Sequence, residues 1–366
     1  MSSTSHSHGD HANGLGFLLT LAGPALLALS ATVGRTTGHL DLIAFLPLAV
    51  AFGVVPALAI SGLNWAEPSP VDAASSPARL YFRLLPAGIV PVQIAALAIA
   101  VDYWSDRSLD MTGRIGWVLS TGIFSALFAI NVAHELIHRR SRVDRVLGGI
   151  LLSTACFGTF KIVHVRVHHR FVCTDRDFSS ARRGDSIYGY WLRNLAGNPR
   201  EALRCERARL RQSRLSMWKS ELAVWYMLSV VWFALAVTLW GWTGGAFFLL
   251  QSLVAILTLD LTNYVQHYGL RRKVDANGRY EPVGAGHAWS MQCRISNLAL
   301  LNLLRHGDHH TRPLEPYHRL RHTPAPAYPY PFAAMILLAL CPPLFRRVVD
   351  PLLEQSTVDT TPLGGS

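Results

Sequence analysis

The sequence predicts an all-α integral membrane protein: a bundle of six transmembrane helices with a histidine-rich cap on its cytoplasmic side. Half of the 366 residues are hydrophobic and only 16% are charged, whereas soluble domains carry about 25% charged residues. The apolar residues collect in runs long enough to cross a bilayer. Nine histidines fall into four short clusters, each where an apolar run meets an arginine-rich stretch.

Six apolar runs have the length of about 20 residues that a membrane-spanning helix needs. Asp41, Arg83 and Asp102 lie near the ends of these runs, where a charged side chain reaches the interface. Asp260 lies deeper and close to His267, and is therefore a candidate functional residue. The predicted spans are residues 15–34, 40–63, 80–103, 115–133, 222–240 and 245–264.

Two further apolar runs are too short to span. Residues 146–160 suit a re-entrant or interfacial segment. Residues 332–345 follow a proline-rich break and predict a short helix at the membrane surface, with a seventh span as the alternative. The membrane domain is therefore expected to cover residues 15–345, followed by a tail over 346–366.

The N-terminal residues 1–14 are polar and lack the basic start of a signal peptide, which predicts an uncleaved disordered tail. This tail carries three histidines outside the nine, namely His6, His8 and His11.

The distribution of positive charge predicts the orientation. Of the 34 lysines and arginines, 18 lie between Arg139 and Lys219, next to predicted spans. Because cytoplasmic loops are rich in these residues, we expect both termini and all four histidine clusters to lie in the cytoplasm, at a bacterial-type inner (plasma) membrane. The net charge of +11 then reflects topology. No nucleic-acid-reading motif accompanies it.

The five cysteines are scattered without a C-x-x-C pair, which argues against a zinc ribbon, a rubredoxin-type appendage or a disulfide framework. They are Cys156, Cys173, Cys205, Cys293 and Cys341.

The spacing of the histidines indicates metal binding. Residues four apart on a helix share one face, and three clusters contain such a pair; His169 is expected about 100° around the helix from His168. Nine imidazoles exceed the needs of one tetrahedral zinc, whereas two metals with four or five ligands each accommodate them. The candidate ligands are His134, His138, His164, His168, His169, His267, His306, His309 and His310.

Other interpretations of single clusters exist. His134-Glu135-Leu136-Ile137-His138 matches the H-E-x-x-H pattern of zinc peptidases, in which the glutamate is a general base; that site would leave six histidines idle. A lone histidine at a span end, such as His267, is commonly an interfacial residue.

Imidazole-rich sites suit iron, copper, zinc or nickel. A metal site at a membrane face beside apolar spans fits oxygen activation for attack on an unreactive C–H bond of a lipophilic substrate. The chain itself shows no second redox centre. The arginine-rich face is therefore a candidate docking surface for a small acidic electron carrier.

Four motifs together resemble the alkane hydroxylases, which are membrane-bound di-iron monooxygenases of the fatty-acid desaturase superfamily. They are H-E-L-I-H at 134–138, H-V-R-V-H-H at 164–169, N-Y-V-Q-H-Y-G-L at 263–270 and L-R-H-G-D-H-H at 304–310. The resemblance covers roughly residues 15–345. The N-Y-x-x-H-Y-G-L element is more specific than the histidine boxes, which desaturases share.

The resemblance implies hydroxylation of the terminal methyl group of an alkane or alkyl-aromatic to a primary alcohol. It implies two non-haem irons held by the same nine histidines and O2 as co-substrate. Electrons are expected from rubredoxin or ferredoxin with an NAD(P)H-dependent reductase. A hydrophobic small-molecule substrate and membrane lipid are the other expected partners, and no nucleic-acid partner is expected. Glu135 and Asp260 are the candidate catalytic residues, and both, with Asp175 and Asp177, are candidates for orienting imidazoles. Asn263, Tyr264 and Tyr268 would pack around His267.

Gln266 departs from the glutamate usual in alkane hydroxylases and resembles the xylene monooxygenase branch, which oxidises methyl groups on aromatic rings. A lipid desaturase or hydroxylase of the same superfamily would lack the element at 263–270. A metal-binding or transport protein without redox chemistry predicts ligands inside several spans rather than at one interface.

Overall fold

The structure is a computed structural model that describes residues 14–61, 70–71, 76–291, 293–323 and 326–358. Over these residues it is helical, and the only β-contacts are two isolated bridges, Val274–Tyr280 and Ser290–Ala327. The predicted all-α class is confirmed. The predicted N-terminal tail, with His6, His8 and His11, lies outside the described residues, which begin at Gly14.

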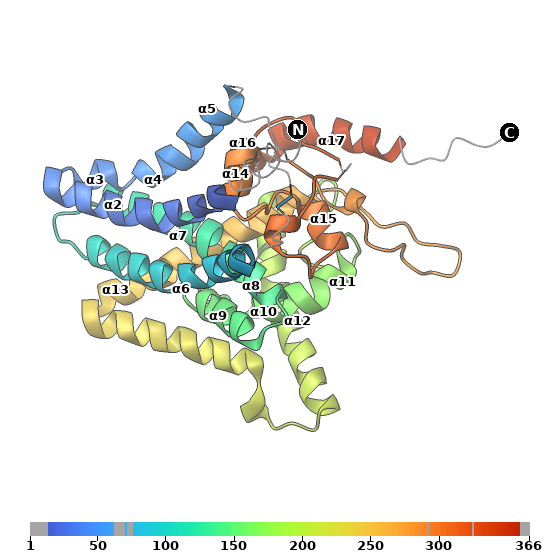
Figure 1. The fold of residues 1–366 in the computed structure, drawn as a ribbon, viewed down its shortest axis with the longest axis horizontal. Helices are drawn as coiled ribbons and strands as arrows, with labels where there is room; N and C mark the ends of the chain where they lie inside the picture. Colours follow the sequence, from blue (N-terminus) through green and yellow to red (C-terminus); the bar gives the residue numbers. More distant parts are fainter. Residues whose placement is uncertain (1–13, 62–69, 72–75, 292, 324–325, 359–366) are drawn as a thin grey trace.

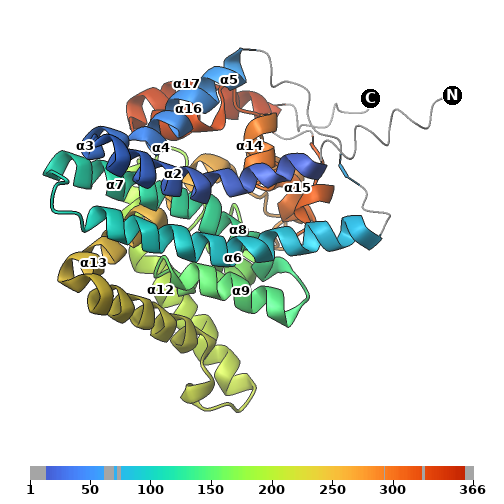
Figure 2. The same cartoon turned by 60° about the vertical axis from the view of Figure 1, so that its left-hand side comes forward.

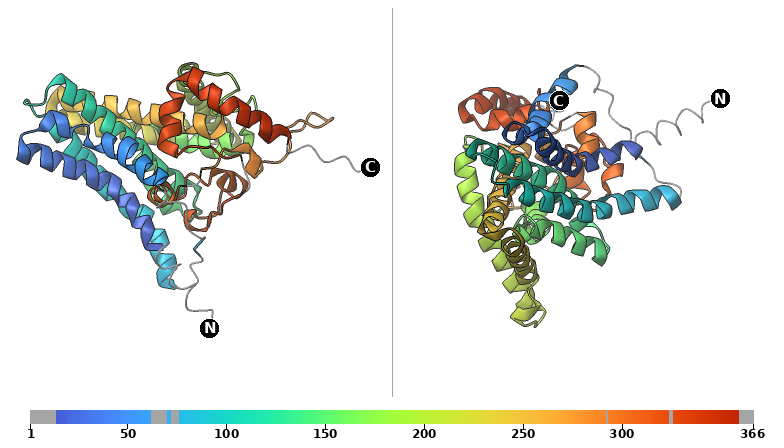
Figure 3. Two further views of the ribbon diagram at one scale, coloured as in Figure 1. Left: turned by 90° about the horizontal axis from the view of Figure 1, so that it is seen from above. Right: turned by 90° about the vertical axis from the view of Figure 1, so that its left-hand side faces the viewer.

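Long apolar helices form one end of the molecule, and shorter helices form the other (Figure 3). Five helical stretches are long and apolar enough to cross a membrane. The chain is therefore a multi-pass membrane protein. The five stretches are Gly14–Thr37, Leu40–Ile60, Pro77–Trp104, Met111–His138 and Glu221–His267.

Local sequence sets several helix ends. Gly38 ends α2 with φ of 74°, a left-handed conformation that glycine adopts without steric cost. Asp110 caps α7 by accepting a hydrogen bond from the Gly113 amide. The first helices are η1 (Phe17–Leu21), α2 (Ala22–Thr37), α3 (Leu40–Ile43), α4 (Leu46–Ala49), η2 (Val50–Val54), α5 (Val55–Ile60), α6 (Ser76–Trp104), α7 (Met111–Phe124), η3 (Ser125–Ile130) and α8 (Asn131–His138).

The last apolar stretch, α13 (Glu221–His267), is 47 residues long and contains one break. Gly241 has φ of 66° and ψ of −170°, outside the helical region. Figure 1 shows the two arms of α13 meeting there and turning back on each other. The two predicted spans at 222–240 and 245–264 thus correspond to the two arms.

The middle of the chain supplies short helices between α8 and α13. The predicted interfacial run at 146–160 is divided between two of them, α9 and α10. These helices are α9 (Arg142–Ser153), α10 (Gly158–Val163), η4 (His164–His168), α11 (His169–Phe171), α12 (Ile187–Gln212) and η5 (Met217–Lys219).

The described C-terminal part contributes six helices, and Figure 1 labels α14, α15, α16 and α17 among them. The predicted start of a tail at residue 346 is wrong, because the last helix continues to 358. Phe345, Val349 and Leu353 of that helix are buried in the core at a spacing of four residues, so it packs as an amphipathic helix. The six are η6 (Ala285–His287), α14 (Arg294–Ala299), α15 (His306–Thr311), η7 (Tyr317–Arg319), α16 (Phe332–Ala339) and α17 (Pro342–Val358).

Candidate metal centre

The nine candidate histidines lie together at the junction of the long helices and the short ones. They form two groups, and within each group one ligand atom from every residue lies within 4.8 Å of all the others. The first group holds five histidines and the second holds four. The first is His134, His138, His164, His169 and His309, and the second is His168, His267, His306 and His310.

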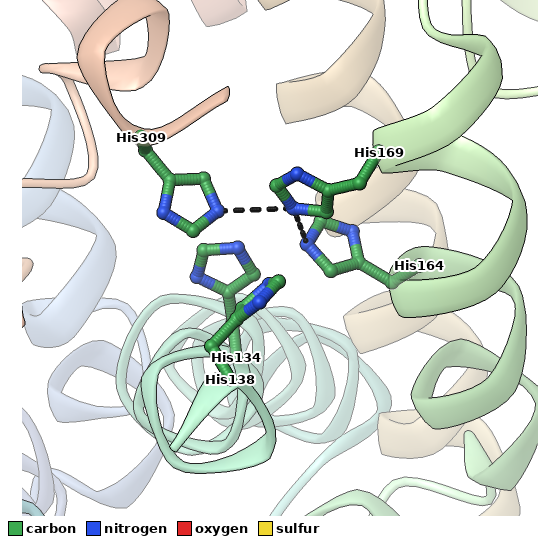
Figure 4. A group of neighbouring side chains, drawn as sticks. All are labelled: His134, His138, His164, His169 and His309. Atoms are coloured by element: carbon green, nitrogen blue, oxygen red, sulfur yellow. Dashed lines mark hydrogen bonds between the residues drawn. The ribbon is translucent and has the colours of Figure 1, made fainter. Parts of the chain in front are cut away.

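Helix α8 places His134 and His138 in the first group, as their spacing of four predicts. All eight residues of α8 are buried. Figure 4 shows both imidazoles pointing from this helix toward His164, His169 and His309.

The second cluster does not follow the predicted spacing. His164 and His168 were expected to share one ion, but His164 joins the first group with His169, and His168 joins the second. The reason is that residues 164–168 form a π-helical turn, in which residue i faces i+5 instead of i+4. The Nε2 atoms of His164 and His169 accordingly lie 3.0 Å apart.

Helix α15 also divides its histidines. His306 and His310, four apart, join the second group, while His309 faces the first. Its Nε2 lies 3.1 Å from Nε2 of His169. His267, the last residue of α13, completes the second group, with its Nε2 3.1 Å from that of His306.

The geometry fits metal binding. Two nitrogens that each lie about 2.1 Å from one ion at right angles are about 3.0 Å apart, and four Nε2 pairs are separated by 3.0–3.1 Å. In the described chain, the buried Nε2 atoms of His134, His138 and His168 have no hydrogen-bond partner. Buried polar atoms are rarely left unpaired without a role. The two groups can therefore each hold a metal ion.

Two imidazoles in the second group are oriented through their other ring nitrogen. Nδ1 of His168 lies 2.8 Å from Oδ2 of Asp177, which also accepts a 2.6 Å hydrogen bond from the Ser180 hydroxyl. Nδ1 of His267 donates to the carbonyl of His287 at 3.0 Å. Such partners fix the tautomer and aim Nε2 at a metal.

The electrostatics of the site keep five of its imidazoles neutral. Burial, followed by repulsion from neighbouring imidazoles, holds the pKa of His164, His169, His306, His309 and His310 well below its ordinary value. Burial alone raises the pKa of Asp177, but the charge and hydrogen bond of His168 and the hydrogen bond of Ser180 lower it by more, so the net shift is downward. Neutral imidazole is the form that binds a metal.

The four carboxylates singled out from the sequence lie in different surroundings. Asp177 contacts an imidazole as expected. Asp175 is exposed and pairs with Arg271 at 2.7 Å. Glu135 is buried and pairs with Arg139 at 3.2 Å.

The fourth carboxylate, Asp260, accepts a hydrogen bond from Asn194 at 3.2 Å. It lines a polar pocket of about 10 Å³ together with His164, His168 and Asn263.

Several positioning residues were missed by the sequence reasoning. Asp308 binds Arg312 through both carboxylate oxygens and accepts from the Arg321 amide, which holds α15 against the following loop. Its place inside L-R-H-G-D-H-H is a signal that could have found it. The carbonyl of His287 has no sequence signal, because any residue carries one.

An apolar cavity of about 240 Å³ lies among the long helices. Its wall is almost wholly hydrophobic and is built from η1, α2, η2, α5, α7, η3, α13, α14 and α16. It extends to Leu300, whose carbonyl accepts a 2.7 Å hydrogen bond from Asn131, three residues before His134. The cavity thus approaches the first histidine group.

Known proteins are similar to this sequence over most of its length. The fatty acid desaturase family model matches residues 112–331. Alkane 1-monooxygenase 2 of Alcanivorax borkumensis is 37% identical, over 90% of this chain and 87% of its own. Alkane 1-monooxygenase 1 of Pseudomonas aeruginosa is 39% identical, over 89% and 88%.

A more distant relative is the hydroxylase component of the Pseudomonas putida xylene/toluene monooxygenase. It is 28% identical, over 65% of this chain and 64% of its own. Together with the histidine geometry, these matches show that the chain belongs to the alkane 1-monooxygenase family of the fatty acid desaturase superfamily.

Proposed function

We propose that this protein is a membrane monooxygenase that hydroxylates the terminal methyl group of an alkane to a primary alcohol. The observation that carries the proposal is an apolar cavity of about 240 Å³ whose wall is hydrogen-bonded to α8, the helix that brings His134 and His138 into the first group of imidazoles. A dry cavity of this kind suits a substrate that offers only C–H bonds.

Iron is the metal that we propose for both groups, with the nine histidines as ligands. Zinc has no redox chemistry, and the five imidazoles of the first group exceed its usual four ligands. Iron is among the metals that imidazole suits, and when bound it would supply activation of O2. Among the described residues, neither group contains a carboxylate, so all donors are neutral nitrogens.

The side chains of the chain then have distinct tasks. The cavity wall excludes water and directs the end of an alkyl chain toward Leu300 and Asn131. Asp177 and the carbonyl of His287 hold two imidazoles in one orientation.

Asp260 is the proposed acid that holds a proton near the site. It lines a polar pocket together with His164 and His168. A monooxygenase needs such a group, because one oxygen atom of O2 leaves as water. Glu135 is proposed in a positioning role, because its carboxylate pairs with Arg139 directly after His138.

Six membrane crossings are part of the proposal. A straight 47-residue helix would be about 70 Å long, more than twice the hydrocarbon thickness of about 30 Å. The break at Gly241 divides α13 into two arms of spanning length. The arginine distribution supports a cytoplasmic position for the histidines and both termini, at the inner membrane.

Electrons are proposed to come from a rubredoxin or ferredoxin with an NAD(P)H-dependent reductase. The five cysteines are free thiols in the structure and form no C-x-x-C pair. A redox partner must therefore deliver the two electrons that each turnover consumes.

An aromatic methyl substrate of the xylene type is the second candidate, and Gln266 is the observation that favours it. Gln266 is buried and donates a 3.2 Å hydrogen bond to the carbonyl of Leu303. It is not among the residues that line the apolar cavity. Its influence on the substrate would therefore act through the Leu303 backbone.

Product analysis tests the proposal. Cells that express the protein with a carrier and its reductase are given octane, hexadecane, xylene and a fatty acid in parallel, and products are identified by gas chromatography. Primary alkanols are expected as the main products. A desaturated fatty acid as the main product would contradict the proposal. His138→Ala should abolish hydroxylation while membrane insertion, measured by fractionation, stays intact.

A further inference from the structure

A groove of about 460 Å³ outside the histidine site is lined by five arginines and a single carboxylate. It lies where the first turns of α6 meet the end of α8 and the loop before η7. Figure 2 shows these turns of α6 projecting between α9 and α15. The six charged lining residues are Arg79, Arg83, Arg139, Arg140, Arg319 and Asp144.

The floor of the groove is rigid. The Phe82 ring stacks on His318, with ring centroids 4.0 Å apart and planes inclined by 11°. Arg139 donates to the backbone carbonyls of Phe82 and Arg83 at 3.1 and 2.9 Å, and its charge is matched by Glu135 and Asp144. This arginine therefore holds α6 to α8 and is not available to a ligand.

The rim carries positive charge that the protein does not neutralise. Arg79, Arg83 and Arg140 are exposed, and their guanidinium groups make no hydrogen bond or ion pair within the described residues. Arg79 and Arg83 are four apart on α6 and so lie on one face. A guanidinium group can bind phosphate through two parallel hydrogen bonds.

Exposed leucines lie directly beside these arginines. Leu80 and Leu84, each one residue after an arginine of the rim, are both 54% exposed. They form an apolar stripe on α6 about 100° around the helix from the arginine face. α6 is one of the long apolar helices, so the stripe continues along a membrane-spanning surface.

We propose that this groove binds the headgroup phosphate of an anionic phospholipid, with the acyl chains along Leu80 and Leu84. Three unpaired guanidinium groups select negative charge, and the adjacent leucines select a ligand that carries a hydrocarbon tail. An acidic soluble protein is a poorer fit, because it would leave the two exposed leucines beside the arginines in contact with water. The site is independent of the substrate and of the metal ions.

Native mass spectrometry of the full-length protein in mild detergent, titrated with phosphatidylglycerol, tests the proposal. Arg79→Gln/Arg83→Gln is expected to weaken binding by about 30-fold, since each arginine near a charged lipid surface contributes about a factor of five. The matched control is Arg207→Gln/Arg211→Gln, an exposed pair with the same spacing on α12 whose side chains have no partner in the part of the chain that the structure describes. It should bind as the unmodified protein does.

Further measurements distinguish a lipid phosphate from a free phosphate ion. Leu80→Ser/Leu84→Ser should also weaken lipid binding, and inorganic phosphate should not displace the lipid. Displacement by inorganic phosphate, with no effect of the leucine changes, would overturn the proposal in favour of a soluble anion. Unchanged lipid binding in the Arg79→Gln/Arg83→Gln variant would overturn the proposal as well. If the electron carrier reduced this variant more slowly than the unmodified protein, the groove would be assigned to the carrier instead.

If the double arginine variant fails to fold, Arg140→Gln replaces it. Arg140 lies in the loop between α8 and α9, and its loss should weaken lipid binding about five-fold. Unchanged binding in this variant would count against the site.

Discussion

Asp177→Asn should empty one group of imidazoles and leave the other intact. Asp177 accepts three hydrogen bonds, from Nδ1 of His168 at 2.8 Å, the Ser180 hydroxyl at 2.6 Å and the Ser179 amide at 3.1 Å. An amide of the same shape keeps one acceptor oxygen and replaces the other with a donor. His168 then either loses its partner or changes its tautomer.

The size of the effect follows from the bond that is lost. A buried hydrogen bond to a charged group contributes about 1.5–3 kcal/mol, which corresponds to about 10- to 150-fold in metal affinity. This range overlaps the 10- to 100-fold loss typical of partners that orient a metal-binding histidine. The loss should be confined to the group of His168, His267, His306 and His310.

Iron content per chain, measured during a chelator titration, is the assay. The unmodified protein should release its iron in one range of chelator concentration, and Asp177→Asn should release half of it at concentrations about 10- to 100-fold lower. Asp175→Asn is the matched control, because Asp175, two residues before Asp177, is exposed and pairs with the surface residues Arg182 and Arg271. Equal loss of iron in both variants, or none in Asp177→Asn, would refute the role assigned to Asp177.

Three further substitutions test other parts of the structure. Gln266→Glu should change the ratio of octane to xylene oxidation, because it alters the contact with the Leu303 carbonyl; an unchanged ratio would remove this position from substrate selection. Ala333→Phe narrows the apolar cavity and should lower hexadecane oxidation more than octane oxidation, so a parallel loss of both would contradict the cavity assignment. Burial raises the pKa of Glu206, but the bonds and charges of Arg209, the Glu221 amide and Arg166 lower it by more. Its stabilisation is therefore present above about pH 4.5 and lost as pH falls further. Glu206→Gln should lower Tm by several degrees at neutral pH and by less near pH 3, and an equal loss at both would contradict an ionic role.

Features with a local cause could be predicted from the sequence. The apolar runs depend only on length and hydropathy, and all six overlap helical stretches of spanning length; residues 62–63 of the second run lie outside the described residues. The pairing of His134 with His138 depends only on one turn of helix. The nine histidines were found because three clusters repeat a spacing of four.

Features that depend on tertiary structure could not. The turn at His164 differs from an α-helix by one residue in its hydrogen bonding, and nothing in H-V-R-V-H-H specifies that difference. Residues from 346 onward were assigned to a tail, whereas α17 continues through them to residue 358 and buries one of its faces. The carbonyl of His287 reaches His267 only because the loop from 268 to 287 folds back.

The division of neighbouring histidines between the two groups has a consequence for assembly. His168 and His169 are adjacent in the sequence but belong to different groups. The same holds for His309 and His310. An ion that enters the first group immobilises His169 and His309, and thereby fixes the backbone that carries His168 and His310. Iron in the first group should therefore speed the loading of the second, so that the metal-free chain fills its two groups in a fixed order.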